Sequence, residues 1–293
     1  MSSPSRLPLP VLFAVLGQTF ISAGTHLAAR QATQEMPPML LVTLRLACSA
    51  VLFALILLVT PGLKVPPRAE WRRVAFFGLL AGPLNQGLFM LGLAHSKATH
   101  AGFLYALTPV GVYLLALALR RETPKRARLV GIGVAFSGVL VLLLGRGLSE
   151  ALGPLLGDLL ILGAVVAWVV FTTESRPFSQ AYGGLRTAGW SLIAGGVFWL
   201  PLAPFTVSVE ALSAVTPLGW KCLGYLVVLT SVVSYGLWNF ALARVDASRV
   251  AIFTNLQPVA TALAAWVVLG EPLTLPLLAG GVLVLVGVRL AQR

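Results

Sequence analysis

Ten apolar segments of about twenty residues each, separated by short connections, constrain this chain more than any other feature. Their approximate bounds are 9–28, 38–60, 73–94, 98–119, 128–145, 154–174, 184–205, 219–241, 249–269 and 274–291. A helix needs about 20 apolar residues to cross the hydrocarbon core of a bilayer. With 58% hydrophobic and only 10% charged residues, the 293-residue chain leaves no room for a soluble domain beside these segments. The sequence therefore predicts an all-α membrane protein with ten transmembrane helices.

Most positive charges fall on one side of these segments. If the N-terminus is cytoplasmic, the inner connections hold 16 of the 21 Lys and Arg residues, and the outer ones hold four. The four outer residues are Arg30, Lys97, Arg146 and Lys221, and the remaining one, Arg45, falls inside the second segment. Cytoplasmic loops of membrane proteins are enriched in Lys and Arg. Both termini are therefore predicted to be cytoplasmic, and the net charge of +12 reports topology rather than nucleic-acid binding.

The chain also resembles itself at a fixed offset. A shift of 149 residues aligns 78–139 with 227–288 without a gap, and 16 of the 62 aligned pairs are identical. Each copy holds five helices, an odd number, so the second copy must enter the membrane from the opposite face. The sequence predicts two inverted five-helix repeats, 1–147 and 148–293. Alternating access around a central site uses this arrangement.

Polar residues within the apolar segments are the candidates for lining such a site, because polar groups are costly in hydrocarbon. Several share a helical face, as Gln18, Ser22 and Thr25 do, and the 149-residue shift places Asn85 on Ser234. The predicted pathway residues are Gln18, Ser22, Asn85, Gln86, Tyr105, Thr108, Trp168, Tyr235, Trp238, Asn239, Thr254 and Gln257. Each of them alone is equally compatible with a role in helix packing. Polar pairs that recur across the two copies favour a pathway for the set.

Two prolines, Pro109 and Pro258, occupy matching positions and are predicted to kink or gate their helices. Proline lacks an amide hydrogen, so the carbonyls of Tyr105 and Thr254, four residues earlier, lose their helical donors. These carbonyls either accept a hydrogen bond from a ligand ammonium, or the kinks only let the helices bend. The sequence indicates no pair of short, interrupted helices.

Charged residues are scarce at the predicted midplane. Of nine carboxylates, only Asp158 and Glu174 fall within a segment, each near its end, which favours a neutral or zwitterionic solute over a cation exchanged for protons. Arg45 has three open interpretations: it snorkels outward, pairs with a carbonyl or Gln18, or meets a ligand carboxylate. His26, His95 and His100 lack a metal-binding spacing and are expected near outer helix ends. No metal, cofactor or catalytic residue is predicted.

The final third of the chain carries a family resemblance. The residues 255–258 (Asn-Leu-Gln-Pro), 264–273, which include Gly-Glu-Pro-Leu, and the glycine-rich final segment through Gly280, Gly281 and Gly287 resemble an EamA-type member of the drug/metabolite transporter superfamily. Residues 107–124 resemble the same motif more weakly, with Arg-Arg-Glu-Thr-Pro in place of Gly-Glu-Pro-Leu. Within the family, the chain is most similar to the YddG-type bacterial exporters of aromatic and other amino acids.

This resemblance implies a multi-pass transporter in a bacterial inner membrane that exports amino acids. One chain of ten helices can enclose a cavity, so a monomer suffices. An exporter of other metabolites or drug-like compounds is the alternative within the same class. A membrane enzyme or receptor is the alternative in a different class, and it is disfavoured because no catalytic constellation or extramembrane domain is evident.

Overall fold

The computed structural model describes residues 8–60, 65–120, 123–144, 152–245, 250, 253 and 256–291. Helices make up the regular structure of this described part, which holds no strand. Seven helical stretches are long and apolar enough to cross a membrane, and Arg128–Leu142, Gln257–Leu269 and Leu275–Ala291 are shorter apolar helices. The predicted all-α class is therefore confirmed.

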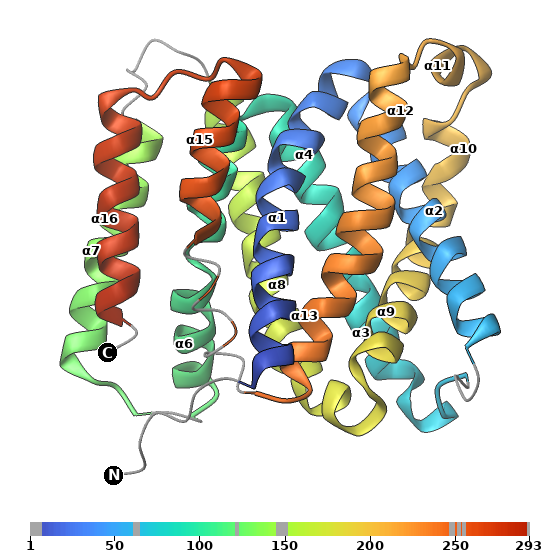
Figure 1. Ribbon diagram of the computed structural model, residues 1–293, viewed down its shortest axis with the longest axis horizontal. Helices are drawn as coiled ribbons and strands as arrows, with labels where there is room; N and C mark the ends of the chain where they lie inside the picture. Colours follow the sequence, from blue (N-terminus) through green and yellow to red (C-terminus); the bar gives the residue numbers. More distant parts are fainter. Residues whose placement is uncertain are drawn as a thin grey trace.

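The helices pack side by side with roughly parallel axes, and α1 lies between α7 and α16 at one end of the molecule and α2 at the other (Figure 1). In the first half they are α1 (Leu9–Glu35), α2 (Pro38–Val59), η1 (Arg68–Glu70), α3 (Trp71–Leu79), η2 (Leu80–Gly87), α4 (Leu88–His95), α5 (Ala98–Tyr105), α6 (Thr108–Ala118) and α7 (Arg126–Leu144). In the second half they are α8 (Leu152–Tyr182), α9 (Gly184–Trp199), η3 (Leu200–Leu202), α10 (Ala203–Thr206), α11 (Val209–Ser213), α12 (Pro217–Gly224), η4 (Tyr225–Ser234), α13 (Tyr235–Leu242), α15 (Gln257–Leu269) and α16 (Leu275–Ala291).

Prolines and one glycine set several helix ends. Helix α2 begins at Pro38, where the missing amide hydrogen costs nothing because the first amides of a helix have no intrahelical partner. Helix α15 ends at Gly270, whose φ of 65° lies in the left-handed region that favours glycine. Helices α1 and α8 end at Glu35 and Tyr182, beyond the predicted ends at 28 and 174. The prediction followed the apolar segments, and polar residues extend both helices beyond them.

Two π-helical stretches interrupt the long third and eighth predicted segments. They are η2 (80–87) and η4 (225–234), and the 149-residue shift makes them overlap. Pro83 lies inside η2 and cannot donate to an α-helical bond, while the Ser231 hydroxyl in η4 donates to the Leu226 carbonyl five residues earlier. The eighth predicted segment is therefore not a regular α-helix over 225–234. Short π-helices are frequent at functional sites.

The predicted helix over 98–119 spans 98–118, but it is interrupted near its middle. Helix α5 ends at Tyr105, a tight turn follows at 106–107, and α6 begins at Thr108. Helix α15 begins at Gln257, the residue that the 149-residue shift places on Thr108. Pro109 and Pro258 both lie in the first turn of their helices. In Figure 1, α6 occupies the lower half and α15 the upper half of the view, so the two helices start near mid-height.

Glycines bring α7 and α16 into backbone contact. A Cβ atom on Gly138 would lie 2.6 Å from the Val284 amide nitrogen, and one on Gly287 would clash with the Ala135 amide nitrogen. Small residues permit this close approach, and van der Waals packing is the main attraction between helices in lipid. Gly133, on another face of α7, would meet nothing within 4 Å.

We predict that Gly138→Leu lowers the thermal unfolding midpoint of the purified protein by several degrees, because the side chain forces two backbones apart at a cost of about 1–3 kcal/mol or more. Gly133→Leu makes the same exchange where space is open and is expected to leave the midpoint within about a degree of wild type or above it. Equal midpoints for the two variants would refute the close α7–α16 contact.

Candidate functional site

A cavity of about 60 Å³ lies among helices from both halves of the chain. Its walls are mostly polar and aromatic. The fourteen lining residues are Gln18, Ser22, Thr25, His26, Arg45, Asn85, Phe89, Tyr105, Thr108, Trp168, Thr230, Ser234, Tyr235 and Gln257. Elements α1, α2, η2, α4, α5, α6, α8, η4, α13 and α15 each contribute at least one of them. The cavity therefore lies where the two halves meet.

The structure brings eight of the twelve predicted pathway residues to this cavity: Gln18, Ser22, Asn85, Tyr105, Thr108, Trp168, Tyr235 and Gln257. Gln86, Trp238 and Asn239 are buried but do not line it. Asn239 instead bonds within the bundle, since its Nδ2 donates to the Tyr235 carbonyl and its Oδ1 accepts from Ser179. Thr254 lies outside the described residues.

Asn85 is the centre of the hydrogen bonding on one side of the cavity. Its Nδ2 donates to the Tyr105 hydroxyl at 2.8 Å and to the Ala164 carbonyl at 2.9 Å, and its Oδ1 accepts from the Tyr235 hydroxyl at 3.1 Å. One amide thus links η2 to α5, α8 and α13. It fixes the positions of two tyrosines from different halves of the chain.

Hydroxyl groups connect α1 to η4 along another side. Thr25 and Thr230 share a hydrogen bond of 2.8 Å, and Ser22 and Ser234 lie 3.4 Å apart. Within α1, the Gln18 Nε2 donates to the Ser22 hydroxyl at 2.8 Å. Thr230 and Ser234 both line the cavity from η4.

Arg45 also lines the cavity, from α2, with only 2% of its surface exposed. It does not snorkel outward, and it does not pair with Gln18. Its Nε donates to the Ser231 hydroxyl at 3.3 Å, and no carboxylate among the described residues forms an ion pair with it. A permanent positive charge therefore borders the cavity without an acidic partner in the described chain.

His26 is not at an outer helix end as predicted. It is 3% exposed, borders the cavity, and its Nδ1 lies 3.1 Å from the Thr261 hydroxyl of α15. The helix α1 continues to Glu35, which places His26 well inside the bundle. Among the described residues no group of three His, Cys, Asp or Glu side chains has a metal-binding arrangement.

Aromatic rings form two further parts of the wall. Trp168 packs against Tyr235 with ring centroids 5.2 Å apart, and Phe89 packs edge-on against Tyr105 at 5.5 Å. Aromatic pairs in these geometries are favourable and offer flat apolar surface. The cavity thus combines polar groups with apolar faces on which a hydrocarbon or aromatic side chain can lie.

The predicted free carbonyl of Tyr105 has a donor of its own. The Thr108 hydroxyl donates to it at 2.6 Å, so the first of the two proposed acceptors for a ligand ammonium is occupied within the chain. The matching carbonyl of Thr254 lies outside the described residues. For Pro109, the remaining interpretation is therefore that it lets its helix bend.

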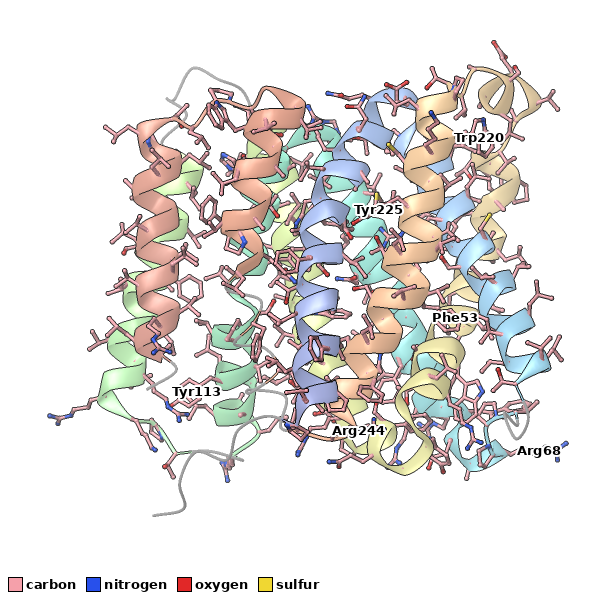
Figure 2. The ribbon with its side chains drawn as sticks, in the orientation of Figure 1. Phe53, Arg68, Tyr113, Trp220, Tyr225 and Arg244 are labelled. Carbon is pink, nitrogen blue, oxygen red and sulfur yellow. The ribbon has the colours of Figure 1, made fainter. Side chains whose placement is uncertain are left out.

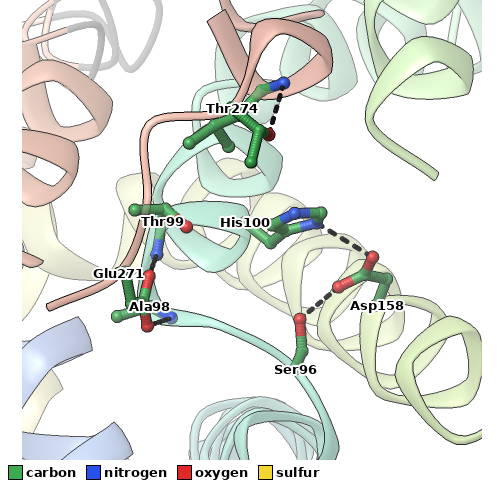
Figure 3. Close-up of polar contacts among 8 residues, drawn as sticks. Ser96, Ala98, Thr99, His100, Asp158, Glu271 and Thr274 are labelled. Atoms are coloured by element: carbon green, nitrogen blue, oxygen red, sulfur yellow. Dashed lines mark hydrogen bonds and ion pairs between the residues drawn. The ribbon is translucent and has the colours of Figure 1, made fainter. Parts of the chain in front are cut away.

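A second polar cluster lies apart from the cavity, at the start of α5 (Figure 3). The Glu271 carboxylate accepts from the amides of Ala98 and Thr99 at 2.9 and 3.0 Å. Asp158 accepts from Ser96 and lies 3.1 Å from His100. Sequence reasoning assigned Glu271 no role, although the Gly-Glu-Pro pattern marked its position. The carboxylate joins the connection after α15 to a helix of the other half.

Replacing Glu271 with Ala is expected to lower the thermal midpoint, because two amides at the start of α5 lose their acceptor at a cost of about 1–2 kcal/mol. Glu210→Ala is the control, since Glu210 is exposed in the first turn of the short helix α11. If both variants unfold at the wild-type temperature, the Glu271 cap contributes nothing to stability.

The chain is similar to known proteins over nearly its whole length. It is 27% identical over 292 residues to the uncharacterized transporter YyaM of Bacillus subtilis, covering 97% of this chain and 94% of that protein. It is 30% identical over 232 residues to a probable terminal-alkyne amino-acid exporter of Streptantibioticus cattleyicolor, covering 79% and 76%. It is 25% identical over 278 residues to the uncharacterized inner membrane transporter YedA of Escherichia coli, covering 92% and 86%.

A solved crystal structure of a protein has the same fold. It matches with a TM-score of 0.66 and 22% identity, over 95% of this chain and 97% of that one. The model of the EamA-like transporter family matches the chain twice, at residues 9–144 and 155–292. These relatives are named as transporters rather than enzymes. The chain is an integral membrane transporter and belongs to the EamA-like transporter family.

Proposed function

We propose that this transporter exports amino acids, aromatic and other neutral or zwitterionic ones, by alternating access around the central cavity. The observation that carries the proposal is the composition of the cavity wall. It combines the Asn85 hydrogen-bond centre, the aromatic faces of Trp168 and Tyr235, and the positive charge of Arg45. An amino acid presents matching features: polar groups at one end and a side chain at the other.

One relative supports amino acids as the substrate class. The similar protein of Streptantibioticus cattleyicolor is named a probable terminal-alkyne amino-acid exporter. The other relatives compared above are named only as uncharacterized transporters. The proposed direction of transport rests on this relative, and the proposed substrate class rests on this relative and on the physical character of the cavity.

We further propose ten transmembrane helices in two inverted repeats, 1–147 and 148–293, with both termini in the cytoplasm of a bacterium and the protein in its inner membrane. The double match of the family model supports the duplication. The 16 to 4 division of basic residues supports the orientation. In Figure 2, Arg68 and Arg244 both lie at the lower edge of the molecule, as does the start of α1 in Figure 1, and Trp220 lies near the upper edge. A monomer suffices, because one chain lines the cavity.

The eight predicted residues at the cavity are proposed to contact the substrate. Gln86, Trp238 and Asn239, which are buried behind it, are proposed to support the wall, and Thr254 keeps its predicted role as the counterpart of Tyr105. Pro109 and Pro258 are proposed to act as hinges, because each begins a half-length helix next to a cavity residue.

Export is tested with the purified protein in liposomes loaded with labelled tryptophan, threonine or methionine. We expect efflux well above that from protein-free liposomes for at least one of the three. Absence of flux for all three would refute amino-acid transport and leave the other metabolite and drug-like substrates as the alternative. Flux measured with and without a pH gradient adds a test of coupling. A cavity without a carboxylate predicts no acceleration by the gradient.

Within the same assay, Gln257→Leu is expected to reduce amino-acid efflux at least about tenfold, because it removes a hydrogen-bonding group from the cavity wall. Gln31→Leu is the matched control. Gln31 lies in α1 away from the cavity and donates to Glu35, so its flux should stay near wild type. Equal flux from both variants would exclude Gln257 from the pathway.

Pro258→Ala tests the hinge. Alanine restores the missing amide hydrogen and removes the ring that sets the first turn of α15. We expect slower efflux with unchanged substrate binding, because the hinge affects the conformational exchange rather than the contacts in the cavity. Wild-type efflux from this variant would remove Pro258 from any hinge role.

A further inference from the structure

Two cavity residues carry buried polar atoms that have no hydrogen-bond partner. One is the Nη1 of Arg45, a charged donor, and the other is the Oε1 of Gln18, an acceptor. The two residues are 2% and 4% exposed. An unpaired buried donor or acceptor costs free energy, and the cost is larger for a charged group. A ligand that supplies both partners recovers this free energy on binding.

The charge of the cavity is one-sided. Among its fourteen lining residues, Arg45 alone has a permanent charge, and none is a carboxylate. The other contact of its guanidinium is a neutral hydroxyl, that of Ser231. A buried guanidinium without a counter-ion is strongly unfavourable in a membrane interior, where charged side chains face a partner or a water-filled cavity. An anionic group is therefore the missing counter-charge.

The starts of two helices add to the same preference for an anion. Helices α6 and α15 both begin at residues that line the cavity, Thr108 and Gln257. A helix N-terminus carries about half a positive charge and exposes amide hydrogens. The two N-termini supplement the charge of Arg45 but do not by themselves specify a ligand. The unpaired guanidinium gives the specificity, because its planar donors match the two oxygens of a carboxylate.

We propose that the Arg45 guanidinium binds the α-carboxylate of the substrate. The Gln18 amide oxygen accepts a hydrogen bond from the ammonium group of the same substrate. The inference rests on the proposed function and narrows it: a transported solute must carry a carboxylate, and amines without one are rejected. The aromatic faces at Trp168 and Tyr235 then receive the side chain. Ser231 is a positioning residue that holds the Nε of Arg45 and leaves Nη1 for the ligand.

The test compares ligands that differ only in their charged groups. Thermal midpoints of the detergent-purified full chain are measured with L-tryptophan, with tryptamine, which lacks the carboxylate, and with indole-3-propionate, which lacks the ammonium. A ligand that binds only the folded state raises the midpoint. We expect tryptophan to raise it most, indole-3-propionate to raise it less, and tryptamine to leave it unchanged. Equal stabilisation of the wild-type protein by tryptophan and tryptamine would by itself overturn the proposal.

Arg45→Gln is expected to weaken tryptophan binding on the order of 10- to 100-fold, the usual loss for a hydrogen bond to a charged group. Without ligand, this variant should unfold at or above the wild-type temperature, because it removes an uncompensated buried charge. An arginine with a purely structural role would give the opposite shift. Arg45→Lys keeps the charge but loses the planar pair of donors and should bind with intermediate affinity. Arg73→Gln is the control for the same loss of charge at an exposed site.

The outcomes separate this inference from the proposed function. If tryptophan is transported and Arg45→Gln binds it like wild type, amino-acid transport is supported and the proposed role of Arg45 is refuted. If no amino acid binds, but indole-3-propionate binds the wild type and not Arg45→Gln, the carboxylate site is supported and amino-acid export is refuted. If none of the three ligands raises the wild-type midpoint, both are refuted. An Arg45→Gln protein that fails to fold contradicts the expected stability, and the ligand comparison on wild type still decides the carboxylate preference.

Discussion

The structure depends on one constraint: inside a bilayer, each backbone amide and carbonyl must find its partner within the protein. Long apolar helices satisfy it automatically, and most of the chain is built from them. The exceptions are therefore informative. The π-helical stretches η2 and η4 and the first residues of α6 and α15 all contribute to one cavity. Irregular backbone at membrane depth is tolerated where it is buried in protein or borders a cavity.

Buried charged side chains also need partners within the protein. The carboxylates of Asp158 and Glu271 are each satisfied by hydrogen bonds at the start of α5 or next to it. Arg45 differs, because a neutral hydroxyl is its one partner in the described chain. An uncompensated charge is costly to the resting protein, and the proposed carboxylate site explains why it is present. Transport of a zwitterion would then need no acidic residue in the cavity.

Sequence patterns located the cavity better than they described its backbone. Gln18 and Ser22 share an α-helical face, and the repeat pointed to Asn85 and Gln257, because these rules need only regular helices and a fixed offset. The π-helix η4 and the turn before α6 interrupt segments that the apolar pattern predicts as regular helices. His26 was misplaced because polar residues carry α1 seven residues past its apolar segment, to Glu35. The Glu271 contact joins distant parts of the chain, and one sequence contains no direct signal for it.

The central claim is that substrate occupies this cavity, and site-directed alkylation tests it most directly. Ser234→Cys places a thiol at the cavity wall after Cys48 and Cys222, the two native cysteines, have been replaced by alanine. The account predicts that tryptophan slows alkylation of this thiol severalfold and leaves a thiol at the exposed Ser213 position unaffected. Alkylation of Ser234→Cys at the same rate with and without saturating tryptophan, under conditions in which tryptophan is transported, would contradict it.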